Sequence, residues 1–360
     1  MRLRTSVGIV ELRVWHGTDP EAGRWGCPIR QHWGLTAHQQ ASPALEDRLA
    51  FTVTATGTFA EAAAVASKWG CPATDSTVHA LTQRLGARAE AHTQQRLAAA
   101  VVEAAPQRAA TELGVLQVDG WQVRQRGPGW GCNKTAKPRV EWHELKTGVF
   151  YRHEQAAQTA GGRGVLAEKV VVNWQGEPLE LGRRLDWEAR RGGLGRAQNT
   201  LVLGDGASWI WNLAADRWRG ATKVLDFYHA SQHLWDLGRA VVGEPKARAW
   251  VEPRLHRLRH GKESAVLAEI AALQPLRGER GKVVRREQGY FAGQEARMHY
   301  ARLAARGWPI GSGAVESACR TRQCRCKRPG QFWIERGLRH LCALEEARAN
   351  GHWDDLWLSA

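Results

Sequence analysis

Two short apolar stretches of the chain each carry an Asp-Gly pair, "LQVDG" with Asp119 and "VLGDG" with Asp205. If each stretch is a strand, its last polar residue lies at the edge of a sheet, where it can contact a ligand, and the glycine lets the chain turn away. Either pair alone is typical of an ordinary turn. A third acid, Glu316, follows the glycine-serine-glycine turn of "WPIGSGAVES", in what we predict to be the first turn of a helix. Two acids on neighbouring strands and a third on a helix are a more specific arrangement than any one of them.

Alternating apolar and polar residues surround these acids and predict strands. The predicted strands are "LGVLQVDGWQVRQR", "RVEWHELKTGVFYRHE", "EKVVVNWQG" and "NTLVLGDGASWIWNLA", the last ending at Asp205-Gly206. A helix is expected around "LELGRRLDWEARRGG", and "ATKVLDFYHASQHLWDLGRAVV" should be a strand that runs into a helix. Residues 231–306 are rich in Ala, Leu and Arg and are expected to be mostly helical. The pattern predicts a mixed α/β core with a helical insertion.

The N-terminal third of the chain follows other patterns. Residues 1–45 are expected to be irregular, with short strands. From residue 46 the period is helical as far as about residue 104, and "TFAEAAAVASKWG" ends at a glycine before "CPATDSTVHALTQRLG" restarts with cap-forming residues. This is typical of a helix-turn-helix, whose second helix can enter the major groove of DNA. Two helices that merely pack against each other are the alternative.

Positive charge indicates a polyanionic partner. Lys and Arg number 51 against 36 Asp and Glu, which gives a net charge of +15. Clustered cations gain free energy by releasing counterions from nucleic acid, although an ordinary basic enzyme has the same composition. The densest run has no acid within it and directly follows the third acid, so we favour phosphate contact over a solvated helix face. Its cations are Arg320, Arg322, Arg325, Lys327 and Arg328.

Seven unevenly spaced cysteines do not form the pattern of a disulfide framework. Cys319, Cys324 and Cys326 are interpreted as ordinary thiols. "CPIR" starting at Cys27 resembles half of a zinc knuckle, but Arg30 stands where the second thiolate should be, so we expect no working zinc site. No apolar run has the ~20 residues that a membrane span needs, and the N-terminus lacks the apolar core of a signal peptide. The sequence therefore predicts a cytoplasmic protein, associated with the nucleoid if it binds DNA.

Three carboxylates that converge in a basic protein make chemical sense as ligands for divalent cations. Mg²⁺ prefers hard oxygen ligands, and Mn²⁺ can take its place. A pair of such ions can activate a nucleophilic oxygen on one side of a phosphate and stabilise the leaving oxygen on the other. The cations around Glu316 would then hold the DNA backbone while the carboxylate helps to hold the metal.

Five blocks of the chain resemble, in order, the DDE transposases of bacterial insertion sequences of the Kra group. They are "VDG", "GDGASWIWNL", "VLDFYHASQHLW", "ARMHYARLAARGWPIGSGAVESACR" and "CKRPGQFW", within residues 46–345. The resemblance implies a ribonuclease H-like catalytic core, a helical insertion between the second and third acids, and two-metal cleavage and strand transfer at transposon ends. It assigns catalysis and metal binding to Asp119, Asp205 and Glu316.

The resemblance also implies supporting residues. "DFYH" places Asp226 and His229 in an acid-x-x-His pattern that several transposase groups carry after the second catalytic acid, although His229 could equally be a histidine packed beside the sheet. Trp209 and Trp211 flank Ile210, and strand alternation would put both on one face. These two residues could simply pack in the core, or one of them could stack on an unpaired base.

Five segments follow from these predictions. They are an irregular remnant of a zinc-knuckle region (1–45), a helix-turn-helix-like DNA-binding domain (46–112), the first part of the ribonuclease H-like core (113–230), a helical insertion (231–306), and C-terminal helices that carry the third acid (307–360). The expected partners are insertion-sequence terminal repeats and target DNA, on which a dimer or larger assembly would form, and no membrane is expected.

Two alternatives to an active transposase stay open. Members of the Kra group commonly carry paired Cys-x-x-Cys knuckles, and only Cys27 remains here, so the chain could be a shortened or decayed copy whose recognition of DNA ends is impaired. One alternative is a decayed transposase that only binds DNA through its helix-turn-helix and basic groove. A pure DNA-binding protein has no reason to keep three acids in a phosphate groove, however, unless metal neutralises them. A metal-dependent DNA nuclease would have the same acids, and only a strand-transfer assay separates it from a transposase.

Overall fold

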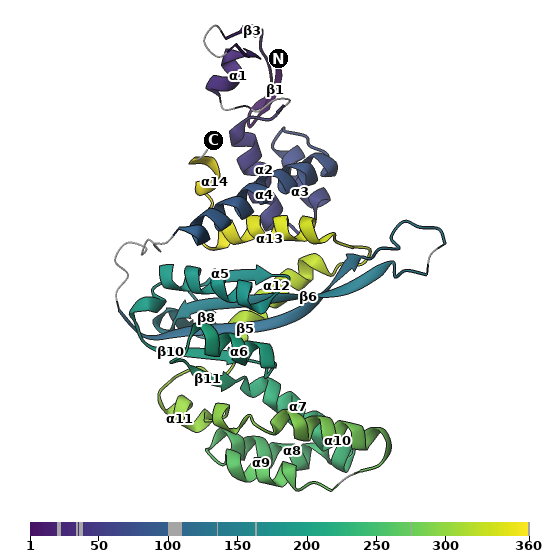
Figure 1. The fold of residues 1–360 in the computed structure, drawn as a ribbon, viewed down its shortest axis with the longest axis vertical. Coiled ribbons are helices and arrows are strands. Elements are labelled where there is room, and N and C mark those ends of the chain that lie inside the picture. The colour runs from purple at the N-terminus through teal and green to yellow at the C-terminus, as the bar shows by residue number, and fades with distance from the viewer. Residues whose placement is uncertain are drawn as a thin grey trace. The chain divides into compact units, whose positions relative to one another are not determined.

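The computed structural model describes residues 1–19, 23–33, 35, 39–99, 110–134, 136–162, 164–274 and 276–358 (Figure 1). The chain folds into two compact units. Unit 1 comprises residues 1–99, 124–142 and 323–360, and unit 2 comprises residues 100–123 and 143–322. No helix in the described part of the chain is long and apolar enough to cross a membrane.

A five-stranded mixed sheet forms the centre of unit 2. Its strands are β5 (Thr111–Arg126), β6 (Val140–Arg152), β9 (Val170–Trp174), β10 (Ala197–Gly204) and β11 (Thr222–Leu225), in the order β11-β10-β5-β6-β9. Strand β10 pairs in parallel with β5 and β11, whereas β9 pairs antiparallel to β6. All five strands were predicted, the first two of them from alternation, and the mixed α/β class is confirmed. The last residues of β5 and the first residues of β6 belong to unit 1.

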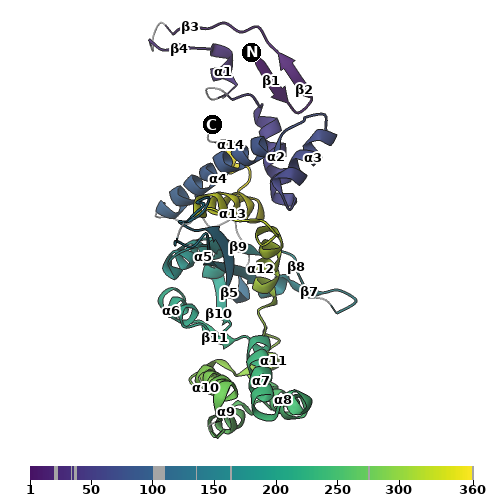
Figure 2. The same ribbon diagram turned by 90° about the vertical axis from the view of Figure 1, so that its right-hand side faces the viewer.

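Helices cover both faces of this sheet. Helix α5 (Pro178–Arg191) connects β9 to β10, and α6 (Ser208–Arg217) connects β10 to β11. Two glycines let these helices approach the strands, because a Cβ on Gly148 would overlap Leu185 of α5 and one on Gly204 would overlap Ile210 of α6. Figure 2 shows α5 and α6 on one side of the sheet and α12 (Gly313–Cys326) on the other.

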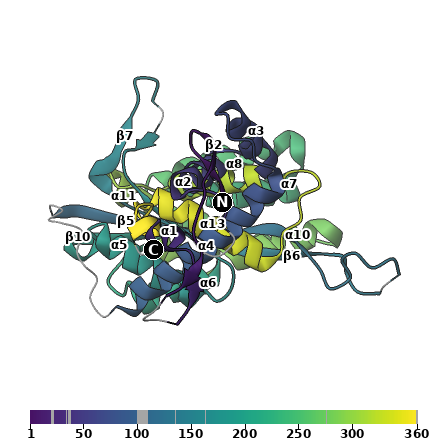
Figure 3. The same cartoon turned by 90° about the horizontal axis from the view of Figure 1, so that it is seen from above.

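The predicted helical insertion is confirmed as a set of helices between β11 and α12. They are α7 (Phe227–Val242), α8 (Glu244–Arg259), α9 (Glu263–Ala271), α10 (Gly278–Phe291), the 3-10 turn η3 (Glu295–Arg297) and α11 (Tyr300–Ala305). The turns η1 (His153–Gln155) and η2 (Leu194–Arg196) and a small hairpin of β7 (Ala156–Gln158) and β8 (Gly164–Leu166) complete the described elements of this unit. The hairpin is seen from above in Figure 3.

Unit 1 contains the predicted N-terminal helices α2 (Pro43–Ala55), α3 (Phe59–Lys68) and α4 (Asp75–Ala98). Ser42, Thr58 and Thr74 cap them, each accepting a hydrogen bond from a backbone N–H in the first turn. The helical period predicted beyond residue 99 lies outside the described residues. The expected short strands of residues 1–45 are present as β1 (Arg2–Thr5), β2 (Gly8–Glu11), β3 (Gly17–Thr18) and β4 (Trp25–Gly26), with a short helix α1 (Pro28–His32).

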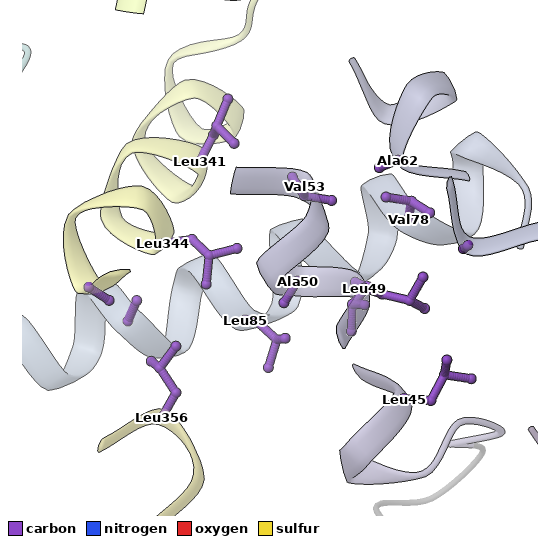
Figure 4. Packing of buried hydrophobic residues seen from close by; sticks show 14 of the residues in the cluster. Leu45, Leu49, Ala50, Val53, Ala62, Val78, Leu85, Leu341, Leu344 and Leu356 are labelled. Atoms are coloured by element: carbon purple, nitrogen blue, oxygen red, sulfur yellow. The ribbon is translucent and has the colours of Figure 1, made fainter. Parts of the chain in front are cut away.

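The core of unit 1 joins the two ends of the chain. Leucines of α2 and α4 pack against α13 (Glu335–Ala349) and α14 (Asp355–Leu358), and the labelled residues of Figure 4 show this cluster. Leu341 and Leu344 of α13 are fully buried in it. Helices α4 and α13 cross closely at Gly86, where a Cβ would overlap the backbone of His340. The N-terminal helices therefore depend on C-terminal residues for their core.

Candidate metal-binding acidic site

Three aspartates lie level with one another across the parallel strands of unit 2. The register pairs Leu203 of β10 with Gln117 of β5, so two residues further along Asp205 is level with Asp119. The same strand pairs Gly204 with Leu225 of β11, which puts Asp226 level with Asp205. Neighbouring strands are about 4.8 Å apart, so this row sets the three aspartates side by side on successive strands.

The prediction that Asp119 lies at the end of its strand is wrong. Strand β5 continues to Arg126, and Asp119 lies in its middle. Gly120 makes no turn there, and it leaves space for Glu144 of the neighbouring strand, because a Cβ would overlap that carboxylate. The same prediction for Asp205 is confirmed, since β10 ends at Gly204 and Gly206 has a φ of 108° that favours glycine.

Asp205 is held from two directions. Its carboxylate Oδ1 accepts a hydrogen bond from the backbone N–H of Ala207, at 2.9 Å. Its backbone carbonyl accepts one from the hydroxyl of Tyr290 in α10, at 2.7 Å. Gly206 lies directly beneath this tyrosine, where a Cβ would be 2.8 Å from the ring. The helical insertion therefore supports the loop that carries the second acid.

Gln117 connects β5 to the turn that precedes the third acid. It lies two residues before Asp119, so both side chains are on the same face of the sheet. The buried Gln117 amide donates to the carbonyl of Gly311 at 3.3 Å, and its oxygen accepts from the N–H of Val315 at 3.0 Å. Glu316 follows Val315 directly and accepts a hydrogen bond from the Ser312 hydroxyl at 3.0 Å.

Asp226 fixes the same turn from the other side. It caps α7, since Oδ1 accepts from the N–H of His229 at 2.7 Å, and Oδ2 accepts from the N–H of Ser312. The N–H of Phe227 also donates to the carbonyl of Ile310, at 2.9 Å. Both carboxylate oxygens of the fully buried Asp226 are thus engaged by backbone donors.

His229 lies among the acids. Its Nδ1 is 3.4 Å from Oδ1 of Asp226 and 4.0 Å from Oε1 of Glu316. The Asp226 carboxylate is the main cause that raises the pKa of His229 to about 9, against the opposing effect of burial, and the charges of Asp205 and Asp119 add to it. With a pKa of about 9, the imidazole is a cation at neutral pH, beside the carboxylates of Asp226 and Glu316.

The pKa values of Asp119 and Asp226, at the two ends of the aspartate row, are shifted in opposite directions. Burial raises the pKa of Asp119, and the negative charge of Asp205 adds to the rise, although the N–H of Gly120 opposes it. For Asp226, burial also acts to raise the pKa, but hydrogen bonds from His229 and Ser312 outweigh it and hold the pKa below its usual value. A nearby positive charge would therefore stabilise the ionised form of Asp119.

Asp226, His229 and Glu316 could hold a metal ion, because their ligand atoms all lie within 4.8 Å of one another. Within the ranges that the structure describes, no second group of three or more His, Cys, Asp or Glu side chains is this close, and Asp119 and Asp205 lie outside it. Cys27, which carried the zinc-knuckle pattern, has no such partners in these ranges, and all seven cysteines are free thiols.

The basic run after Glu316 is less exposed than expected, and the expectation that it lacks compensating acids is wrong. Arg325 is buried against Glu345 of α13 at 3.1 Å, and Arg328 pairs with Glu61 of α3 at 2.9 Å. Arg322 is buried, Lys327 is half-buried and Arg320 is exposed. The compensating acids lie in other segments of the sequence, so they cannot be found from the charges around the basic run.

Trp209 and Trp211 lie in helix α6, so the predicted strand alternation is wrong for them. Residues two apart on a helix point in different directions. Trp211 is only 6% exposed and packs beneath Arg297, whereas Trp209 is half-buried with the Lys146 ammonium 5.5 Å from its ring. Trp211 is therefore a core residue of unit 2.

Sequence reasoning missed Gln117, Tyr290 and Ser312 as residues of this site. Ser312 stands inside the conspicuous "GSG" turn, and Gln117 is a polar residue in an apolar strand two positions before the first acid. Both signals were available. Tyr290 lies in an insertion helix 85 residues from Asp205 and has no local signal.

No protein family and no curated protein matches this chain. Among solved structures, the chain is similar to the Drosophila P element transposase strand transfer complex. The TM-score is 0.29 and the sequence identity 11%, with 87% of this chain and 80% of that chain covered.

Proposed function

We propose that this protein is a DDE-type DNA transposase similar to those of Kra-group insertion sequences. Asp119, Asp205 and Glu316 are its catalytic acids. The reaction is hydrolysis of a phosphodiester at the end of the element, followed by attack of the freed 3′ hydroxyl on target DNA. The observation that carries the proposal is the level placement of Asp119 and Asp205 on β5 and β10, with Gln117 tying the turn before Glu316 to the same strand.

The fold of unit 2 supports a ribonuclease H-like core. Its central sheet is mixed, with helices on both faces, and the helical insertion falls between the second and third acids. Both features were expected from the resemblance of the five sequence blocks to Kra-group transposases.

The acids fit Mg²⁺ or Mn²⁺. All three catalytic candidates offer hard carboxylate oxygens. The pKa of Asp119 is raised mainly by burial and further by the charge of Asp205, so a bound cation would stabilise its ionised form. When bound, such ions activate a nucleophilic oxygen and stabilise the leaving oxygen of a phosphodiester. Asp119, Asp205 and Glu316 would hold them.

Asp226 and His229 have supporting roles in this proposal. Because both oxygens of Asp226 accept backbone hydrogen bonds, we assign it to positioning the turn before α12, rather than to the metal that its closeness to His229 and Glu316 would otherwise allow it to bind. The His229 imidazolium offsets the charge of the acids around it and keeps Glu316 close.

DNA is the substrate and partner in this proposal. Helices α3 and α4 of unit 1 form the helix-turn-helix-like pair that would recognise terminal repeats, and exposed Arg320 would contact phosphate beside the third acid. Two ends must be brought together, so we expect a dimer or larger assembly on DNA.

Metal-dependent cleavage of labelled DNA that carries the element's own ends tests the proposal. We expect cleavage with Mg²⁺ or Mn²⁺, and loss of at least 1,000-fold in rate in Glu316→Gln with DNA binding unchanged, on the order of what a catalytic metal supplies. Glu279→Gln, at an exposed acid of α10, is the matched control. A wild type that binds these ends and never cuts them contradicts the proposal, and cutting without strand transfer identifies a nuclease.

A further inference from the structure

A ladder of cations and aromatic rings lines the hairpin tip, which we define as residues 124–134 and 136–142, the described part of β5, β6 and their connecting loop that belongs to unit 1. The Arg126 guanidinium lies 5.1 Å from the ring centre of Trp130, which packs 4.8 Å from Phe332. Arg124 lies 5.2 Å from Phe332 and 5.9 Å from Trp142. The hairpin tip extends beyond the helices of unit 1 in Figures 1 and 3.

Backbone contacts hold this ladder in place. Arg124 donates to the carbonyl of Arg328 at 2.8 Å. The backbone of Trp333 pairs with both arginine positions, donating to the carbonyl of Arg124 and accepting from the N–H of Arg126. Arg139 donates to the carbonyl of Cys132 at 2.8 Å. The rings and guanidinium groups are therefore arranged before any ligand binds, which lowers the entropic cost of binding.

The hairpin tip is both aromatic and cationic at its surface. Trp142 is 59% exposed and Trp130 is 39% exposed, although water normally disfavours large open indole surfaces. From Arg126 to Arg139 the sequence has four cations and no acid. All four are exposed: Arg126, Lys134, Lys137 and Arg139.

We propose that the hairpin tip binds DNA at a junction between duplex and unpaired bases, with Trp142 stacking on an unpaired base. The proposal deepens the proposed function, because it names the DNA form and a second surface that binds it. The exposed cations contact phosphates, which carry no sequence information. An indole face fits any exposed base, and stacking of this kind is tolerant of sequence.

The combination of features favours this DNA form. Intact duplex keeps its base faces stacked inside, so it would engage the cations and leave Trp142 without a partner. An acidic protein surface would be drawn by the cations too, and the self-association arm of the test below identifies that outcome. The Arg124 guanidinium lies 5.9 Å from the ring centre of Trp142 and adds a cation that strengthens stacking on a base.

Binding to two labelled DNAs without metal tests this inference. One is a blunt duplex and the other is the same duplex with an unpaired flap. We expect Trp142→Ala to weaken binding of the flap DNA about 10-fold or more and binding of the blunt duplex less than 2-fold, with Trp142→Phe close to wild type. Trp15→Ala, at an 87% exposed indole outside the hairpin tip, should leave both affinities unchanged.

The cations are tested separately. Lys134→Gln with Lys137→Gln should weaken binding of both DNAs and reduce the slope of log affinity against log salt by about 2. Equal affinities of wild type and Trp142→Ala for flap DNA would overturn the inference. So would a Trp142→Ala variant that loses self-association in ultracentrifugation while its DNA binding is intact, because the surface would then bind protein.

These outcomes are independent of catalysis. If wild type never cuts DNA but Trp142→Ala selectively loses flap binding, the proposed function fails and the hairpin-tip inference stands. If wild type cuts its ends and Trp142→Ala binds both DNAs as wild type does, the inference alone fails. Unfolding midpoints of all variants, compared with wild type, show that each is folded.

Discussion

Gln117 makes the geometry of the acidic site depend on one buried amide. Replacing it with leucine leaves the carbonyl of Gly311 and the N–H of Val315 without their partner, at a cost of about 2–3 kcal/mol. Because Glu316 follows Val315, we also expect cleavage to slow about 10- to 100-fold, with DNA affinity unchanged. Single-turnover cleavage and denaturant unfolding measure the two effects. Gln122→Leu, at an exposed position of the same strand, is the control, and equal activity of both variants would contradict the role.

Glu287 gives the helical insertion a pH-dependent stability. Burial acts to raise its pKa, but hydrogen bonds from His233 at 2.6 Å and from Arg286 outweigh burial and hold the pKa below 4.5. Its contribution is therefore present above pH 4.5 and is lost as the pH falls through the lowered pKa. We expect Glu287→Gln to lower the unfolding midpoint at pH 7 and to narrow its gap to wild type toward pH 3. A constant gap across this range would refute the assignment.

Helix α10 controls the loop that follows β10 through Tyr290. Tyr290→Phe removes the donor to the Asp205 carbonyl and keeps the ring that stacks on His233 at 3.6 Å. The loss in stability should be about 1 kcal/mol. We expect the Mg²⁺ concentration for half-maximal cleavage to rise several-fold, because the second acid is held less firmly. Tyr228→Phe, at an exposed tyrosine of α7, controls for the substitution. An unchanged metal requirement would show that Tyr290 is only a packing residue.

Strands and helices with a clear hydrophobic period could be predicted from the sequence, but the pairing of these elements could not. Strands β5 and β6 follow from alternation, because burial of one face imposes period 2. The other three strands were predicted as short stretches beside them, and the helices of the insertion from a composition rich in Ala, Leu and Arg. Strand alternation was applied to Trp209 and Trp211 beyond the predicted strand end at Asp205-Gly206, whereas these residues lie in helix α6. Asp119 was expected at or near a strand end because the glycine after it could let the chain turn away, whereas Gly120 makes room for Glu144.

The residues of the candidate site also fall into a group that could be predicted from the sequence and a group that could not. Its acids stand beside turn-forming glycines and could be named from sequence. The groups that position them, Gln117 and Tyr290, are linked to the acids through contacts between distant segments, and so are the acids that compensate Arg325 and Arg328.

At the scale of the whole molecule, unit 1 is assembled from both ends of the chain. Leu344→Ala in α13 should destabilise this unit by about 2–5 kcal/mol, because the leucine is fully buried in its core. In hydrogen exchange we expect peptides from residues 43–98 to lose protection while those from 197–225 keep it. Leu179→Ala, at a 55% exposed leucine of α5, should change neither. Equal loss in both regions would mean that the two units unfold together.

Because Asp119, Asp205 and Asp226 lie level on neighbouring strands, residues can be inserted or deleted at only some positions of the chain without disturbing this row. Deleting one residue within β10 would move Asp205 back along the strand by about 3.3 Å and turn its side chain to the opposite face of the sheet. The same deletion in the connection between α6 and β11 would leave the strand ladder intact, since loops absorb such changes at the surface. Insertions and deletions during the history of this protein should therefore be absent from the ends of β10 and β11 and collect in the connections between elements, even where substitutions are common in both.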